Sequence, residues 1–514
     1  MNPIALLIVI MIPLAGGMFM LVLPFKKRKR FEIYTEAVVL AASVLFFLLL
    51  LKKPAGTFTL IQFVNHLTIS FRLDGMSMVF GGLISGLWPF ATLYAFEYMR
   101  HEENHLGERH ERRFFAFYTM TYGITLGIAL ADNLLTMYCF YEMLTLITLP
   151  LVMYTMTREA ILASRKYLYY SLGGAAFGFI ALIFIIVYGN VSFRYGGSLD
   201  LELIGSRTNV LLLVYVFAFF GFGVKAAVCP FNAWLPAASV APTPVTALLH
   251  AVAVVKSGAY AVLRLTYYCF GAEFLRGTWA QDVVMTAALV TILYGSVRAV
   301  KETHFKRRLA YSTISNLSYI LFGASIMSPA GLVGALTHMM FHGVMKICSF
   351  FCAGAVICQS GRIYVHQLDG LGRKMPRVFG MFTLAALALM GVPGLCGFVS
   401  KWNLAAAAME SGNPLAYIGV GVLLLSALFT AIYMLTVVVR AFFPQRDFSY
   451  AALEGIHDPN WYMLVPLSVF CIVIVFFGLY STPFVDFLTA IGRGQTGKVR
   501  ASYDRRAACA QTGG

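Results

Sequence analysis

Long apolar stretches recur along the whole chain and constrain its fold more than any other feature. Each runs for about 18 residues or more, which is enough for a helix to span a hydrocarbon core of roughly 30 Å. Of the 514 residues, 59% are hydrophobic and only 12% are charged, and the mean hydropathy is +0.76, so a soluble globular fold is excluded. The sequence therefore predicts an all-α polytopic membrane protein with about fourteen transmembrane helices.

The distribution of basic residues predicts how these helices are oriented. The first apolar stretch, residues 4–24, lacks the basic residues before it and the cleavage site after it that a signal peptide has. The net charge of +16 does not indicate nucleic-acid binding, because the basic residues lie in short loops without interleaved aromatic side chains. Most lie in alternate loops, beginning at 26–30. The positive-inside rule then predicts a multi-pass protein of the cell (inner) membrane with its N-terminus outside.

Two of the expected helices, helix 7 and helix 12, contain proline close to a lysine. In helix 7, Pro230 and Pro236 follow Lys225. In helix 12, Pro393 precedes Lys401. Proline removes a backbone donor, and the freed groups are tolerated at membrane depth only where protein or a water-filled cavity covers them. A pair of interrupted helices in corresponding positions predicts two inverted repeats, with an ion path near the middle of the membrane.

The connections between the apolar stretches suggest how the chain is divided. We expect one transmembrane domain over residues 1–514. Its parts are helices 1–3 in 1–112, the first repeat with helices 4–8 in 113–270, the second repeat with helices 9–13 in 281–440, and helix 14 with a basic tail in 461–514.

A small set of protonatable side chains lies deep inside the apolar stretches. A charged group at the centre of a membrane helix costs about 2.5–3.5 kcal/mol on an insertion scale, so the bundle must pair or hydrate such groups. Arg264, near the end of helix 8, is expected to reach the interface by snorkelling. The candidates for proton transfer are Glu142, Lys225, His250, Lys256, His338, His342, Lys346 and Lys401.

Three of these candidates form a ladder in one segment, LTHMMFHGVMKICSF. His338, His342 and Lys346 are four residues apart, which places them on one face of a helix. The structural alternative is that neighbouring helices satisfy the histidines and that the lysine snorkels. Three groups in register favour function instead, because histidine titrates near neutrality and such groups can pass protons through water.

The other candidates suggest an ion pair and a relay. Glu142 could be a protonated carboxyl group bonded within the core, but an ion pair with Lys225 that opens and closes during a cycle is the better interpretation. His250 and Lys256 are six residues apart, so they do not share a helix face and rise about 9 Å along the axis. That separation suits a water-bridged relay.

The sequence supports a metal or cofactor site less well than it supports proton transfer. The segment HMMFH has the histidine spacing of the zinc-protease motif HExxH, but Met339 replaces the general base and no third ligand is evident. A bis-histidine haem between His250 and His338 or His342 is geometrically conceivable. The nine cysteines form no CxxC pair. Because no nucleotide loop, iron–sulfur motif or flavin site is visible, we expect no cofactor.

Four segments together resemble a known family. They are GFGVKAAVCPFNAWLPAASVAPTPVTALLHAVAVVKSGAY, KRRLAYSTISNLSYI, THMMFHGVMKICSFFCAGAV and GVPGLCGFVSKW. They are similar to the antiporter-like, proton-conducting subunits shared by respiratory complex I, Mrp-type sodium/proton antiporters and membrane-bound [NiFe]-hydrogenases. The resemblance covers about residues 70–440.

The resemblance implies a role for each candidate residue. Glu142 and Lys225 match the helix 5 glutamate and helix 7 lysine thought to gate proton movement. Lys256 matches the central helix 8 lysine of some members, and His250 the histidine of others. The 338/342/346 ladder resembles the helix 11 connection. Lys401 matches the terminal group of helix 12, which is glutamate in some members.

These observations predict a proton-translocating subunit of a redox-driven membrane complex, of the hydrogenase or complex I type, with no redox centre of its own. The expected partners are other membrane subunits, including homologous antiporter-like ones, and lipid. The transported ion is the proton, with Na+ as a second candidate. The alternative is a subunit of an Mrp-type Na+/H+ antiporter that an ion gradient drives.

Overall fold

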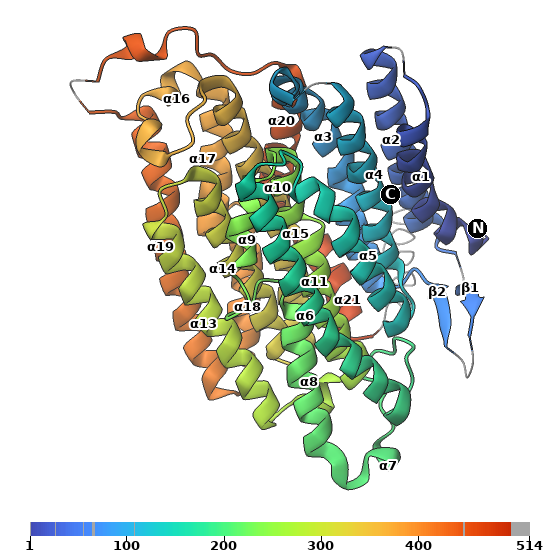
Figure 1. Cartoon of the computed structure of the whole chain (residues 1–514). Coiled ribbons are helices and arrows are strands. Elements are labelled where there is room, and N and C mark those ends of the chain that lie inside the picture. The colour runs from blue at the N-terminus through green and yellow to red at the C-terminus, as the bar shows by residue number, and fades with distance from the viewer. Residues whose placement is uncertain are drawn as a thin grey trace, which may run out of the picture.

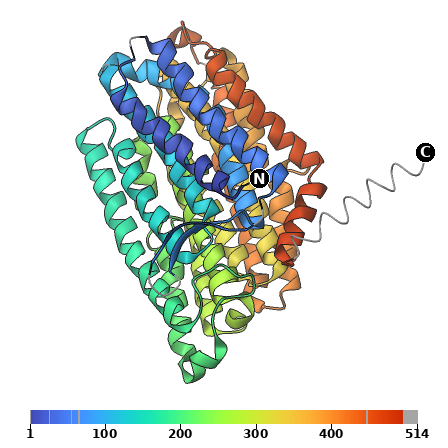
Figure 2. The same ribbon diagram turned by 90° about the vertical axis from the view of Figure 1, so that its right-hand side faces the viewer.

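The chain folds into a bundle of helices with one two-stranded sheet at its edge (Figures 1 and 2). This computed structural model describes residues 2–25, 27–54, 56–63, 67–106, 108–445 and 448–494. Among those residues, 11 helices are long and apolar enough to cross a membrane. The protein is therefore an all-α, multi-pass membrane protein, as predicted. The number of about fourteen spans stays a prediction, and most of the predicted basic tail, from residue 495, lies outside the described residues.

The N-terminal part packs as a group of four helices. α1 lies against α4 and α2, and α3 packs against both α2 and α4. The two strands pair antiparallel, with Phe58 opposite Phe71. The bounds of these elements are α1 Ile4–Val22, α2 Arg28–Lys52, β1 Phe58–Gln62, β2 Thr68–Phe71, α3 Gly75–Leu106 and α4 Glu108–Leu130.

The remaining helices complete the bundle, and several of them are short. The elements up to the middle of the chain are α5 Leu134–Val152, α6 Arg158–Tyr188, α7 Leu201–Ile204, α8 Thr208–Gly223, α9 Trp234–Ala237, α10 Thr243–Ala251, α11 Val254–Arg264 and α12 Ala272–Leu275. Those that follow are α13 Trp279–Lys301, α14 Phe305–Ser325, α15 Pro329–Ser360, α16 Leu371–Lys374, α17 Pro376–Met390, α18 Cys396–Glu410, α19 Pro414–Phe442, α20 Trp461–Leu479 and α21 Thr482–Gly492.

α10, α11 and α15 form the centre of the bundle. Every residue of α10 and α11 is buried, and α15 is buried over most of its 32 residues. α15 packs against α10, α14, α17 and α18, so helices from both halves of the chain meet around it. Because other helices surround these three, their polar and charged side chains, such as Lys256 and His342, are buried together with the apolar ones.

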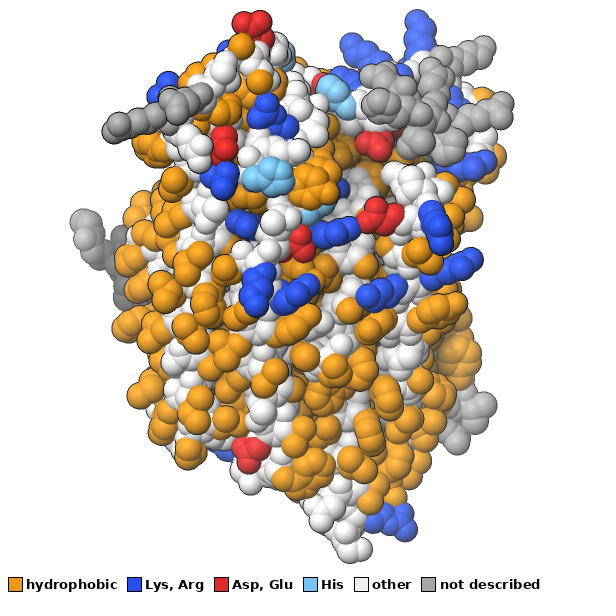
Figure 3. All heavy atoms as spheres, turned by 60° about the vertical axis from the view of Figure 1, so that its left-hand side comes forward, with side chains coloured by type: hydrophobic (Ala, Val, Ile, Leu, Met, Phe, Trp, Pro, Cys, Tyr) orange, Lys and Arg blue, Asp and Glu red, His pale blue; other side chains and the backbone are white. Residues whose placement is uncertain are grey.

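The outer surface has two distinct zones. In the view of Figure 3, Lys, Arg, Asp and Glu side chains gather toward one end of the molecule, and a broad hydrophobic surface follows below them. The same end carries α16 and the last residues of α3 in Figure 1. A hydrophobic belt of this kind suits contact with lipid, whereas the charged end suits water.

The chain around Lys225 leaves the helical path and is packed tightly by a glycine. α8 ends at Gly223, and turns follow as far as α9. Gly258 of α11 lies so close that a Cβ on it would be 2.5 Å from the backbone nitrogen of Ala226 and 2.9 Å from the Cβ of Lys225. Only glycine allows this approach without displacing the backbone.

The chain around Lys401 is interrupted in a similar way. α17 ends at Met390, and Gly391 and Gly394 take positive φ values of 93° and 86° before α18 begins. Gly478 of α20 packs directly on the backbone at Gly394. α20 therefore contacts the chain directly at this interruption.

Replacing Gly258 by alanine is expected to destabilise the protein by about 1–3 kcal/mol, because the added methyl group overlaps backbone atoms that cannot rotate away. The matched control is Gly421→Ala in α19, where no atom lies within 4 Å of the new Cβ. That change should be neutral or stabilising by up to about 1 kcal/mol. Thermal unfolding in detergent measures both; an equal midpoint for the two variants would contradict the tight packing at Lys225.

Candidate functional site

The first part of the site is the contact between Glu142 and Lys225. Glu142 lies in α5, and its Oε1 is 4.0 Å from the Nζ of Lys225. The lysine side chain is fully buried, whereas 22% of the glutamate side chain is exposed. Lys225 Nζ also donates a hydrogen bond to the carbonyl oxygen of Tyr141 and lies 3.4 Å from the centroid of the Tyr141 ring. The buried Lys225 ammonium group therefore has three attractive partners: the Glu142 carboxylate, the Tyr141 carbonyl and the Tyr141 ring.

The second part joins α11 to the ladder of α15. Lys256 is fully buried, and its Nζ lies 2.6 Å from Nδ1 of His342. The rings of His342 and His338 stack with centroids 5.6 Å apart and an angle of 14° between their planes. Lys256, His342 and His338 thus form one continuous group of protonatable side chains that two helices supply.

The ladder continues to Lys401 through residues of two other helices. His338 Nδ1 lies 3.0 Å from Oγ of Ser400 in α18, and Ser400 in turn donates to the carbonyl of Gly397. The Tyr319 ring of α14 lies 5.1 Å from the His338 ring and 5.5 Å from Nζ of Lys401. Tyr319 and Ser400 therefore connect the ladder to the second interrupted segment.

Lys401 is held by the end of the preceding helix. Its Nζ donates to the carbonyl oxygens of Leu389 and Met390, at 2.7 and 3.1 Å. These are the last carbonyl groups of α17, which have no partner within the helix. A cation suits this end because the helix dipole places partial negative charge there.

Lys346 and His250 lie beside the row of side chains that runs from Lys256 through His342 and His338 to Lys401. Lys346 donates to the carbonyl of Leu309 at 3.1 Å and to Oγ of Ser312 at 2.7 Å, both in α14. The His250 ring packs against Phe350 in a tilted arrangement, with centroids 4.8 Å apart, and neither of its ring nitrogens has a hydrogen-bond partner among the described residues. The lysine still interacts electrostatically with both His250 and Lys256.

Two sequence expectations need correction here. His250 and Lys256 do not lie on one continuous helix, because α10 ends at Ala251 and α11 begins at Val254. Arg264 does not snorkel: it is fully buried, and its guanidinium group forms two hydrogen bonds, of 2.5 and 2.7 Å, with the Asp74 carboxylate. Desolvation would favour neutralisation of Asp74, but the arginine lowers its pKa below the usual value.

The contacts of the His338 and His342 ring nitrogens test whether these residues could hold a metal ion or a haem. Nδ1 of His338 and Nδ1 of His342 are both engaged with protein groups, whereas their Nε2 atoms have no partner among the described residues. Within the same residues, no three His, Cys, Asp or Glu side chains gather in a group suited to hold a metal ion. The contacts that are present suit proton exchange between neighbouring side chains.

Sequence reasoning missed Tyr319, Ser400 and Asp74 as partners of the candidate residues. Tyr319 and Ser400 are uncharged residues in apolar segments, and they carry no charge signal. Asp74 directly precedes α3, where an acidic residue is an ordinary helix cap; it accepts a hydrogen bond from the backbone nitrogen of Ser77. A search for a carboxylate partner for Arg264 could have found it.

Comparisons with known proteins agree with this architecture. The sequence matches the family model described as NADH:quinone oxidoreductase/Mrp antiporter, TM, over residues 131–430. It is 29% identical to the "Putative antiporter subunit mnhA2" of Staphylococcus aureus over 93% of this chain. The chain spans 61% of the length of that relative.

Three solved structures have the same fold. The Mrp complex from Dietzia sp. DQ12-45-1b contains a chain with a TM-score of 0.81 at 22% identity, covering 97% of this chain and 98% of that one. The membrane-bound sulfane sulfur reductase, an archaeal respiratory membrane complex, gives 0.80 at 21% identity, covering 96% and 97%. Respiratory complex I from Thermus thermophilus gives 0.77 at 21%, covering 96% and 99%.

The family match spans more than half of the chain and includes every candidate residue from Glu142 to Lys401. The chain therefore belongs to the family of antiporter-like transmembrane subunits shared by NADH:quinone oxidoreductase and Mrp antiporters.

Proposed function

We propose that this chain translocates protons as one subunit of a multi-subunit, redox-driven membrane complex of the hydrogenase or complex I type. The observation that carries the proposal is the row of buried and half-buried protonatable side chains between the two interrupted segments. The row consists of Glu142, Lys225, Lys256, His342, His338 and Lys401, with Lys346 and His250 beside it.

Unpartnered polar atoms along the row support the presence of water. A buried polar atom without a partner is costly, and ordered water is the usual remedy. Such atoms, unpartnered among the described residues, are Nε2 of His338 and His342, Oδ1 of Asn316 and Oγ of Ser257 and Ser318. Protons can move through water between side chains that do not touch, which the gap between Lys225 and Lys256 requires.

The proposed cycle begins at Glu142. When Lys225 is charged, the glutamate 4.0 Å away stabilises it; when the pair separates, burial disfavours the charge and the lysine releases its proton. Water and Lys256 would receive that proton, and the ladder would carry it toward Lys401. Energy would come from a redox partner subunit, because this chain has no recognisable motif for a redox cofactor.

His342→Leu is expected to lower proton translocation at least about tenfold, because it removes the side chain that contacts both Lys256 and His338. The matched control is His366→Leu, at an exposed position outside the row. Proton uptake by vesicles that contain the assembled complex is the measurement. If the His342 variant assembles and translocates protons at the unchanged rate, the ladder is not part of the proton pathway.

The second candidate function is a subunit of an Mrp-type Na+/H+ antiporter. It is favoured by the name of the staphylococcal relative, which is described as an antiporter subunit. Vesicles that contain the complex distinguish the two candidates. A redox complex moves protons on addition of electron donor in sodium-free buffer, whereas an antiporter moves them only when a sodium gradient is imposed.

The expected surroundings of the chain follow from the same proposal. We place it in the cell (inner) membrane with its N-terminus outside and its charged end, shown in Figure 3, in the cytoplasm. Its partners would be other membrane subunits, including homologous antiporter-like ones. Cysteine labelling from the two sides of sealed vesicles tests the orientation.

A further inference from the structure

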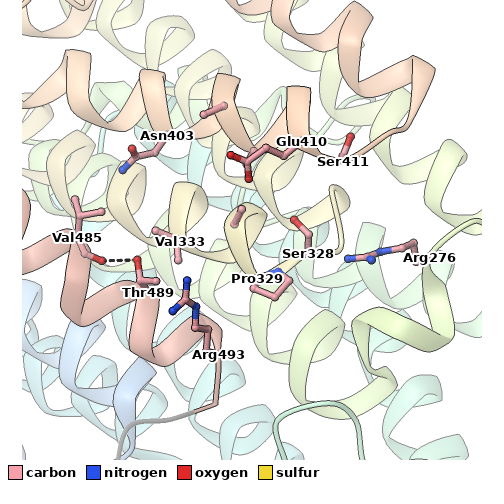
Figure 4. Close-up of a pocket in the computed structure, with 13 residues that line it drawn as sticks. Arg276, Ser328, Pro329, Val333, Asn403, Glu410, Ser411, Val485, Thr489 and Arg493 are labelled. Atoms are coloured by element: carbon pink, nitrogen blue, oxygen red, sulfur yellow. Dashed lines mark hydrogen bonds between the residues drawn. The ribbon is translucent and has the colours of Figure 1, made fainter. Parts of the chain in front are cut away.

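A cavity of about 510 Å³ lies apart from the row, between α15, α18 and α21. Figure 4 shows side chains from all three helices and from the loop at Arg276 around it. Its volume is in the range of cavities that bind small ligands, about 300–1,000 Å³. Among the residues of the row, Lys401 and His338 are nearest in sequence to residues that line this cavity, but neither of them lines the cavity itself. The cavity is therefore a separate candidate site.

Charges of both signs line this cavity. Arg276 and Arg493 reach it from different elements, and Glu410 faces it from the end of α18 (Figure 4). Arg276 is fixed in place, because its guanidinium group donates two hydrogen bonds to the carbonyl of Met327, at 3.0 and 2.5 Å. The Glu410 carboxylate would repel a simple anion, and the two arginines would repel a simple cation. A ligand with a phosphate and an ammonium group satisfies both.

One residue that lines the cavity has a hydrogen-bond donor without a partner among the described residues. Nδ2 of Asn403 is buried and has no hydrogen-bond partner among the described residues. A buried donor without an acceptor is costly, so an acceptor supplied by a ligand would stabilise it. Phosphate and ester oxygens of a phospholipid are such acceptors.

The surroundings favour a lipid over a soluble molecule. Trp402 and Met409 are neighbours of the lining residues on α18, and they are 63% and 58% exposed. Tryptophan is enriched where membrane helices meet the head-group region. Acyl chains would lie on this apolar face while the head group occupies the cavity.

We propose that the cavity binds the head group of phosphatidylethanolamine, with the phosphate at Arg276 and Arg493 and the ammonium group at Glu410. Arginine binds phosphate oxygens through several N–H groups at once. The primary ammonium group donates hydrogen bonds to the carboxylate, which a trimethylated choline cannot do. The site does not depend on the proposed proton transport.

The test is native mass spectrometry of the full chain, purified in detergent and titrated with phosphatidylethanolamine, phosphatidylglycerol or phosphatidylcholine. We expect phosphatidylethanolamine to bind about tenfold more tightly than the other two, as one charged hydrogen bond allows. Glu410→Gln should remove this preference, and Arg493→Gln should weaken both phosphatidylethanolamine and phosphatidylglycerol. Arg207→Gln, at another exposed arginine, is the control and should change nothing.

Three results would overturn the proposal. One is equal binding of all three lipids by the unchanged chain. Another is a preference for phosphatidylethanolamine that survives Glu410→Gln. The third is displacement of the lipid by inorganic phosphate at millimolar concentration, which would indicate a site for free phosphate. All the changed side chains are exposed, and a thermal unfolding midpoint equal to that of the unchanged chain verifies that each variant is folded.

Discussion

Lys225→Ala is expected to abolish proton translocation by the assembled complex, to at least about a hundredfold below the unchanged rate. The reason is that Lys225 is the fully buried cation beside Glu142, and no other basic side chain is within ion-pair distance of that carboxylate among the described residues. Without it, Glu142 loses its counter-charge and water on that side loses its proton acceptor. The measurement is acidification of sealed vesicles during turnover of the complex.

A second variant separates charge from proton exchange. Lys225→Arg keeps the positive charge, but a guanidinium group does not release its proton in proteins. We therefore expect Lys225→Arg to assemble and yet to fail in translocation. Lys301→Ala, at an exposed lysine at the end of α13, is the control. Normal translocation by the arginine variant would show that the residue supplies only charge, and the proposed relay would be wrong.

Arg264→Met is expected to destabilise the protein by about 3–5 kcal/mol, the usual cost of leaving one member of a buried ion pair alone. Asp74 would lose the two hydrogen bonds and the counter-charge that Arg264 now supplies, so its charged form would be buried without a cationic partner. The aromatic rings of Phe193 and Tyr268, which lie 4.8 and 4.6 Å from the guanidinium carbon, would lose their cation as well. Thermal unfolding, followed by tryptophan fluorescence, measures the loss.

The double variant Arg264→Met, Asp74→Leu tests the cause. It removes the uncompensated charge, so it should be more stable than Arg264→Met alone. Arg207→Met, at an exposed arginine, should leave the midpoint unchanged. Because the folded-state pKa of Asp74 is lowered, its stabilising effect is present at neutral pH and is lost as the pH falls through that pKa. Equal midpoints for the single and double variants would contradict this account.

The parts of the site that follow from burial alone could be predicted from sequence. A lone carboxylate and a lone lysine in apolar segments have few partners available, so pairing of Glu142 with Lys225 was the natural hypothesis. The structure brings their charged atoms to 4.0 Å. The spacing of His338 and His342 likewise fixes their common helix face, and their rings stack.

Contacts between different helices could not be predicted in this way. The spacing along one helix does not indicate which neighbour a side chain meets, so the contact of Lys256 with His342 rather than a relay through His250 was not foreseen. The interruption at Val252 and Ala253 has no proline or glycine to mark it. Arg264 was misjudged because the end of an apolar segment suggests access to water, whereas its partner lies 190 residues away in the chain.

The unbroken course of α15 has a consequence for how the protein can move. Its 32 residues form a single hydrogen-bonded rod, while the segments that hold Lys225 and Lys401 are interrupted at each end of the row. A continuous helix resists bending, and displacements of a packed bundle concentrate where the backbone lacks its helical bonds. α15 is thus a fixed reference frame, and distances from spin labels on it to the two lysine segments should report the working motions of the protein directly.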